Sequence, residues 1–219
     1  MSEKFRTDLI LNFHPRDCPG WEYREFDGNE KILKSGWERT LRSLRKKQLC
    51  ALQTMKDSRK LHENLFKDLT PSDHGYFAGH YRGEPFRCLR CYRVCVPADS
   101  RVGHEPPIVD KSMVEFSEVI QAIFNAIDAG NKTIVSKKQK IVFAVKAVCR
   151  LFVKFLEIHP YANGNGHIAR IFIWAFLSNF NIWPTRLPVE PGPTGYGRHI
   201  ADYRSGKTTP LELFVLGCI

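Results

Sequence analysis

The sequence predicts a mainly α-helical fold that carries one small β-hairpin. Apolar residues recur at near three-to-four spacing over 31–66, 112–129 and 136–157, which is the period of an amphipathic helix. Residues 168–180 (IARIFIWAFLSNF) are apolar nearly all round. A helix without a polar face is buried on every side, so we expect this segment at the centre of the core.

The hairpin is predicted within residues 76–109. Apolar and polar residues alternate there around Gly and Pro, which is typical of short strands joined by turns. We place its tip at Ala98–His104, and Pro106–Pro107 ends the segment. Residues 1–30 are also punctuated by Pro and Gly, and we expect them to be irregular.

Length and composition favour one globular domain with a small appendage. The chain has 219 residues, of which 43% are hydrophobic, enough for a substantial core. It contains no run of about 18 uncharged apolar residues, so a membrane span is not expected. Charges flank the short apolar stretch at the N-terminus, which does not resemble a secretory signal. The sequence therefore favours a cytoplasmic protein.

The charge balance favours anionic partners. Thirty-three basic and twenty-three acidic side chains give a net charge of +10. A dense share of the basic residues lies in Arg39–Lys47 (RTLRSLRKK), which we interpret as an exposed, solvated helix face. Nucleic-acid binding through this stretch is disfavoured because it lacks interleaved aromatic residues and any known nucleic-acid motif.

The cysteines are expected to be reduced. Seven is an odd number, as expected for free thiols. Cys88, Cys91 and Cys95 lie close together and raise the alternative of zinc, but a structural zinc site needs four ligands and no second pair follows. We favour small buried or edge side chains in a strand.

The strongest functional signal is HPYANGNGHIAR, residues 159–170. Pro160 ends the preceding helix, and Gly164-Asn165-Gly166 opens the buried one. Two glycines around an asparagine allow backbone N–H groups to converge at the positive end of a helix, where they bind phosphate oxygens. Arg170 follows about one turn later and can hold a phosphate oxygen bidentately.

Two further residues of this segment suggest phosphoryl or nucleotidyl transfer. His159 precedes the glycines and is a candidate general base, because imidazole titrates near neutrality. The carbonyl oxygen of Asn163 is placed to contact magnesium or a phosphate-bound water. The alternative is an ordinary turn between two helices. We favour function because His, Pro, an aromatic residue, GNG and Arg occur together at these offsets.

This segment resembles the Fic family signature, HPFx(D/E)GNGRxxR. The segments LHENLFKDLTPSDHGYFAGHYRG and GKTTPLELF also look like parts of that family. The resemblance implies residues 61–219 as a Fic-like domain, with a helical core and a hairpin flap, and residues 1–60 as an N-terminal extension with helices packing on it. It further implies transfer of AMP, or another phosphate-containing group, from a nucleotide such as ATP to a hydroxyl side chain of a target protein.

The resemblance also assigns roles to particular residues. The target would dock as an extra strand at the flap, about Leu89 to Val96. Tyr161, where the family has Phe, would anchor the loop in the core. The implied site residues are His159 as the base, Asn163, Gly164, Asn165, Gly166, His167 and Arg170 around the nucleotide, and Asn163 toward Mg²⁺.

Two positions depart from the family pattern. Asn163 stands where a carboxylate usually binds magnesium, and a neutral amide binds a hard dication more weakly. His167 replaces an arginine and would donate to a terminal phosphate only when suitably protonated. These departures leave two hypotheses: a protein adenylyltransferase, or a weak or inactive Fic-fold module that binds nucleotide or protein.

Overall fold

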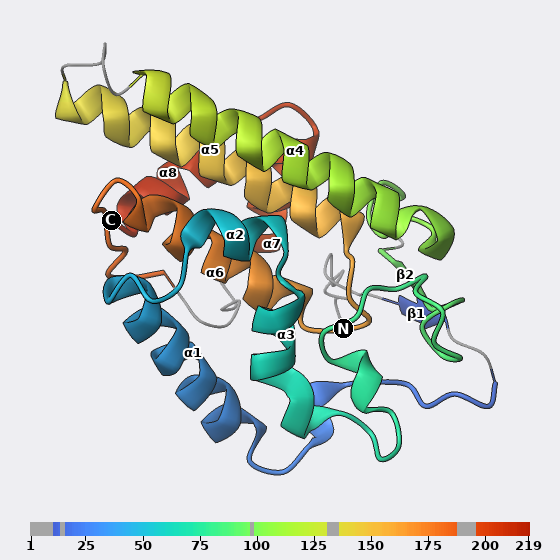
Figure 1. The fold of residues 1–219 in the computed structure, drawn as a ribbon. Coiled ribbons are helices and arrows are strands. Elements are labelled where there is room, and N and C mark those ends of the chain that lie inside the picture. The colour runs from blue at the N-terminus through green and yellow to red at the C-terminus, as the bar shows by residue number, and fades with distance from the viewer. Residues whose placement is uncertain (1–10, 14–15, 97–98, 131–135, 188–195) are drawn as a thin grey trace, which may run out of the picture.

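Helix α6 runs through the centre of the molecule (Figure 1). It covers Asn165–Ser178 in the computed structural model, which describes residues 11–13, 16–96, 99–130, 136–187 and 196–219. Every side chain of α6 from His167 to Leu177 is buried, as predicted. The elements in chain order are β1 (Leu11–Phe13), η1 (Tyr23–Glu25), α1 (Asn29–Arg45), α2 (Ala51–Lys56), α3 (Arg59–Phe66), η2 (Lys67–Leu69), η3 (Gly75–Phe77), β2 (Arg93–Cys95), α4 (Pro106–Gly130), α5 (Lys137–Ile158), α6, α7 (Tyr196–Arg204) and α8 (Thr209–Gly217).

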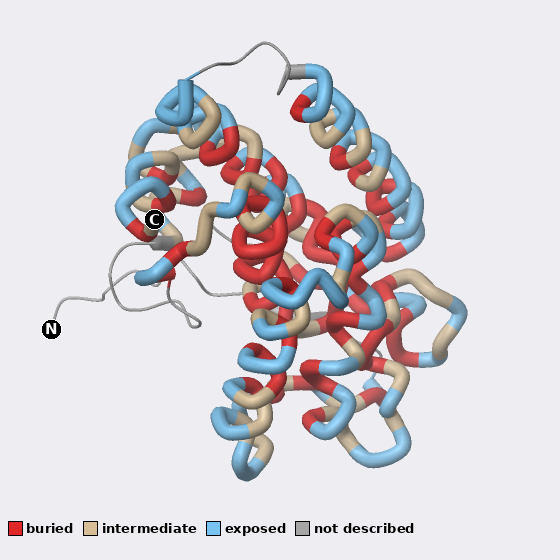
Figure 2. The backbone as a smooth tube through the Cα atoms, turned by 60° about the vertical axis from the view of Figure 1, so that its left-hand side comes forward, coloured by how far each residue is buried: buried red, intermediate tan, exposed pale blue. Residues whose placement is uncertain are grey.

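The mainly α-helical fold is confirmed: α1, α2 and α5 contact α6, and the other helices pack on these. Helix α5 lies along α6, α4 lies beside α5, and α1 and α2 contact α6 from another side (Figure 1). Aromatic rings join these layers: Phe172 of α6 meets Phe155 of α5 edge-on at 4.8 Å and stacks with Phe116 of α4 at 6.3 Å. Figure 2 shows the buried stretches meeting in this interior. None of the described helices is long and apolar enough to cross a membrane.

The helical pattern predicted over 31–66 is divided among three helices. Helix α1 ends at Arg45, and Lys47 takes a left-handed conformation with φ 55° that no helix can continue through. Helix α2 ends at Lys56, after which Asp57 accepts hydrogen bonds from the backbone and side chain of Arg59. Apolar periodicity survives both breaks because each short helix turns its apolar face toward the same core.

The basic stretch Arg39–Lys47 is exposed, as predicted. It covers the second half of α1 and the turn after it, and its arginines and lysines lie on the surface. The solvated-face interpretation of these charges is therefore confirmed.

The strand in the predicted hairpin pairs with the N-terminal segment. Strand β2 is antiparallel to β1, with Leu11 opposite Cys95 and Phe13 opposite Arg93. Among the described residues of the predicted hairpin, the pairing within the segment is an isolated bridge between Val96 and Asp99. Residues 97–98, part of the predicted tip, lie outside the described residues. Alternation identifies a strand but not its partner, and here the partner comes from far away in the sequence.

The expectation that all cysteines are reduced is wrong for one pair. Cys18 and Cys88 form a disulfide, and both are buried. An odd count guarantees only one unpaired thiol. Cys91 is exposed and Cys95 is partly buried, and the described residues contain no cluster of three or more metal-ligating side chains. The disulfide and β1–β2 together join the N-terminal segment to the segment that precedes α4.

Replacement of Cys18 by Ser should lower the free energy of unfolding by up to about 4 kcal/mol, because the bond closes a loop of 70 residues and restricts the unfolded chain. Urea denaturation in the absence of reductant measures this. Cys50→Ser, at an exposed free thiol, is the matched control and should change stability by less than about 0.5 kcal/mol. Equal stability of the two variants would show that the bond does not form in solution.

Candidate functional site

Arg82 fixes the end of α5, where the candidate site begins. Its guanidinium is fully buried and donates to the carbonyl oxygens of Ile158 (3.1 Å), His159 (2.8 Å) and Tyr92 (3.1 Å). Its backbone N–H donates to the carbonyl of Pro160 at 2.8 Å. Carbonyls at a helix C-terminus have no helical donor, and here one side chain supplies several. The loop after α5 is therefore held at three consecutive residues.

His159 is held in one orientation and in one tautomer. It ends α5 in a left-handed conformation with φ 53°, and its side chain is 7% exposed. Its Nδ1 lies 3.1 Å from the carbonyl oxygen of Leu156. Since a carbonyl only accepts, Nδ1 carries the proton and Nε2 carries a lone pair. Burial, with the nearby charges of Arg82 and Arg204, lowers the pKa of His159 to about 3, so the ring is neutral near pH 7.

A second buried histidine supports the loop from α3. His62 accepts the backbone N–H of Gly79 at Nδ1 (3.0 Å), so its Nε2 donates to the carbonyl of Asn163 (3.0 Å). Its ring stacks on Tyr161 at 3.8 Å, and burial lowers its pKa to about 3. The Tyr161 hydroxyl bonds to buried Ser58 at 2.7 Å. Tyr161 therefore anchors the loop in the core, as the resemblance implied.

Gly164 and Asn165 shape the opening of α6. Gly164 has φ +77°, and a Cβ there would lie 2.5 Å from the ring of Phe66, so only glycine fits. The side chain of Asn165 accepts the N–H of Tyr161 (2.9 Å) and donates to its carbonyl (2.8 Å). Asn165 thus closes the loop with its side chain and offers only its backbone N–H to a ligand.

Gly166 and Arg170 form the part of the site suited to an anion. The backbone N–H groups of Asn165 and Gly166 open α6 and find no acceptor among the described residues. A Cβ at Gly166 would lie 3.2 Å from Nη1 of Arg170, so the missing side chain leaves space beside the guanidinium. Helix-opening N–H groups beside a guanidinium fit phosphate oxygens.

Asn163 does not by itself make a magnesium site. Its Nδ2 donates to the carbonyl of Trp21 (2.8 Å), and its Oδ1 accepts the N–H of Gly164 (2.7 Å). The amide is neutral, and its oxygen already takes a hydrogen bond. Mg²⁺ prefers carboxylates and phosphates, so the described residues around the loop do not fit a metal held by the protein alone.

His167 is bound by the N-terminal segment. Trp37 of α1 donates to its Nδ1 (3.0 Å), so the neutral ring carries its proton on Nε2, which lies 3.0 Å from the hydroxyl of Tyr23. The residue is 2% exposed, and burial, followed by the charges of Arg170 and Arg24, lowers its pKa to about 2. In this arrangement both ring nitrogens of His167 already have protein partners, and its expected role toward a phosphate stays a prediction.

The predicted residues have different contacts in the structure, and their roles toward a nucleotide stay predictions. His159 caps α5, Gly166 and Arg170 lie in the first two turns of α6, and the side chain of Asn165 joins the loop between them to α6. Between residues 159 and 170 only Asn163 and Gly166 keep intermediate exposure, so access is narrow. The sequence analysis did not find the supporting residues Arg82, His62, Trp37 and Tyr23. No motif marks them, because they act through positions distant in sequence.

The stability of the fold should fall with acid because three buried histidines are neutral. In the unfolded chain each takes up a proton below pH 6.5, whereas in the fold the pKa values of His62 and His159 are about 3 and that of His167 about 2. Their contribution is present above pH 6.5 and is lost as pH falls toward those values. We expect the free energy of unfolding to drop by about 4 kcal/mol between pH 7 and about 5.5. Urea denaturation across this range tests it, and His62→Gln should remove about a third of the drop. An unchanged free energy would contradict the neutral state.

Replacement of Arg82 by Met should destabilise the fold by about 2–4 kcal/mol, because three carbonyl oxygens lose their donors. Urea denaturation is the measurement. The matched control is Arg90→Met at an exposed position, with an expected change below about 0.5 kcal/mol. A loss of the same size in both variants would remove Arg82 from this role.

Comparison with known proteins agrees with this geometry. The sequence profile of the Fic/DOC family matches residues 53–177, from α2 to the end of α6, which is more than half of the chain. A search of curated proteins gives no match. The family transfers nucleotide-derived groups to proteins, and its matched region contains the buried helix, the loop and the candidate base described above. The chain belongs to the Fic/DOC family.

Proposed function

We propose that this protein transfers AMP from ATP to a hydroxyl side chain of another protein. The single observation that carries the proposal is the orientation of His159, whose Nδ1 proton is held by the carbonyl of Leu156, so that its lone pair is on Nε2, at the start of the loop that leads into α6. Nucleotidyl transfer needs a positioned base and stabilisation of phosphate charge, and the loop supplies both.

The proposed reaction uses the chain's own residues in order. The N–H groups of Asn165 and Gly166 and the guanidinium of Arg170 hold the phosphates. Nε2 of His159 takes the proton of the target hydroxyl, whose oxygen attacks the α-phosphorus. The bond from that phosphorus to the bridging oxygen breaks, and pyrophosphate leaves. The phosphodiester remains on the target, and the proton passes from His159 to solvent.

The target would reach this site along the flap. Within the described residues, β2 has a strand partner on one edge only, which is β1. Main-chain hydrogen bonding along the flap, about Leu89 to Val96, would add a target segment beside it. Magnesium would arrive bound to the nucleotide phosphates, and Asn163 would add at most one neutral oxygen.

The second candidate is a module that binds nucleotide or protein without turnover. The observation that favours it is the burial of His167 under Trp37 and Tyr23, which leaves residue 167 with no contact to offer a nucleotide. Transfer and nucleotide binding without turnover both require the anion site formed by Asn165, Gly166 and Arg170, which we call the anion cradle, and only transfer requires the lone pair of His159.

The two candidates are separated by incubating the protein with cell lysate and ATP labelled at the α- or the γ-phosphate. Transfer of the α-label alone is expected, because AMP carries only that phosphorus. His159→Ala should abolish labelling while leaving nucleotide affinity in calorimetry unchanged within about twofold, since the variant keeps the cradle. Transfer of the γ-label would assign phosphoryl transfer instead, and undiminished labelling by His159→Ala would remove this residue as the base.

Gly166→Ala is the companion variant. Its φ lies outside the left-handed region, so alanine is tolerated by the backbone, but its Cβ fills the space beside Arg170. Nucleotide affinity should fall by about tenfold or more, because the phosphate site is obstructed. Binding with the wild-type affinity in Gly166→Ala would place the nucleotide elsewhere.

A further inference from the structure

A second cleft, of about 450 Å³, lies between α5, α7 and the loop after β2. It is distinct from the helix opening at Gly166. We call it the α5–α7 cleft, and its polar lining is mostly cationic. The polar side chains that line it are Arg101, Arg150, Lys154, Glu157, Tyr203 and Arg204.

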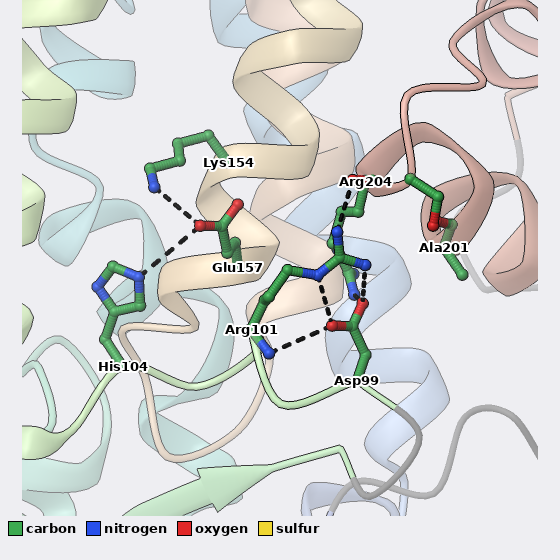
Figure 3. Close-up of polar contacts among 8 residues, drawn as sticks. Asp99, Arg101, His104, Lys154, Glu157, Ala201 and Arg204 are labelled. Carbon is green, nitrogen blue, oxygen red and sulfur yellow. Dashed lines mark hydrogen bonds and ion pairs between the residues drawn. The ribbon is translucent and has the colours of Figure 1, made fainter.

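One carboxylate holds two of these cations in place. Asp99 accepts from Nε of Arg101 (2.8 Å) and from Nη1 of Arg204 (2.6 Å), as Figure 3 shows. The side chains of Asp99 and Arg204 are only 10% and 11% exposed, so this pairing is shielded from solvent. Two guanidinium groups share one carboxylate, and the group therefore keeps a net positive charge with its donors already oriented.

Helix α5 adds two more cations on the facing wall. Arg150 and Lys154 are one turn apart and so lie on the same side of the helix. Lys154 pairs with Glu157 at 2.9 Å, and Glu157 also lies 4.0 Å from His104 (Figure 3). Arg150 is exposed and forms no ion pair within the described part of the chain. Its charge is available to a ligand.

Backbone hydrogen bonds join one wall of the cleft to the C-terminal end of α5. The loop after β2 donates from the N–H of Gly103 to the carbonyl of Glu157 (2.8 Å) and from the N–H of His104 to that of Ile158 (3.2 Å). These carbonyls directly precede His159. Glu157, which lines the cleft, lies two residues before His159 in the sequence, so the cleft and the candidate base are both at the C-terminal end of α5.

We propose that the α5–α7 cleft binds an acidic segment of the protein substrate, with its carboxylates against Arg150, Arg101 and Arg204. This rests on the proposed transfer to a protein and names the chemistry of the target next to the modified hydroxyl. Four cations and one carboxylate, Glu157, line the cleft, and Asp99 behind the lining pairs with two of these cations, so an acidic ligand completes the charge balance. A polynucleotide fits less well, because Tyr203 is the only aromatic side chain in the lining.

The test uses fluorescence anisotropy with a short labelled peptide in which glutamate alternates with serine, and with its glutamine counterpart. The full chain should bind the glutamate peptide, and binding should weaken as salt rises. Arg150→Glu should lower affinity by at least about tenfold, because it places a like charge against the ligand. Arg150 is exposed, so the substitution leaves the core intact.

The controls separate this cleft from general surface charge and from the transfer reaction. Lys34→Glu makes the same charge change on the exposed face of α1 and should keep affinity within about twofold. His159→Ala should bind the peptide as the wild type does, so binding can be established even if no transfer is found. Three outcomes would each overturn the proposal. The first is an equal loss of affinity in Arg150→Glu and Lys34→Glu, and the second is equal binding of the glutamine peptide. The third is tighter binding of a single-stranded oligonucleotide with the same dependence on Arg150.

Discussion

The carbonyl groups at the end of α5 have no partners within their helix, and the buried guanidinium of Arg82 supplies them from a segment far away in the sequence. A cation inside a protein is costly unless its donors are used, and burial lowers the pKa of Arg82 to about 10. Its donors meet carbonyls of Ile158, His159 and Tyr92, so the cost is offset only when the loop and the flap take this arrangement together. The left-handed backbone of His159, and with it the direction of the imidazole, follows from that requirement.

The requirement that buried polar groups be hydrogen-bonded also explains the three histidines at the loop. Each is neutral, and each uses Nδ1 in a way that fixes its tautomer: His159 donates to a carbonyl, whereas His62 and His167 accept N–H groups. A lysine or arginine at these positions would bring a charge with no counter-ion nearby, and an apolar residue would leave the donors and acceptors of the loop unpaired. Of the three rings, only that of His159 has a lone pair that accepts no hydrogen bond from another described residue, which is the property required of a base.

The sequence analysis predicted the elements whose evidence is local. The segment IARIFIWAFLSNF predicts that α6 is buried, and GNG predicts the turn that opens it. Both predictions depend only on neighbouring residues in the sequence. The pairing of β2 with β1, the Cys18–Cys88 bond and the contacts of His167 were not predicted, since each joins residues that lie more than 60 positions apart. His167 shows the limit most clearly: its offset in the motif suggested a phosphate ligand, whereas the fold places an indole and a phenol against its ring.

These long-range contacts make the N-terminal segment part of the surroundings of the loop. The sequence predicts residues 1–60 as an extension of the domain, and that boundary stays a prediction. Trp21 bonds to Asn163 of the loop and to Leu69. Tyr23 and Trp37 bond to His167 of α6. A ligand that reached His167 would have to replace the hydrogen bonds of Tyr23 and Trp37. The disulfide and the β1–β2 ladder join the same segment to the flap. The loop that follows the flap bonds to the carbonyls of Glu157 and Ile158 at the end of α5. We therefore expect a movement of the N-terminal segment that widens access to Gly166 to shift the flap, where the target is proposed to dock. In the proposed reaction, nucleotide entry and target docking would therefore depend on one connected set of contacts rather than on two independent ones.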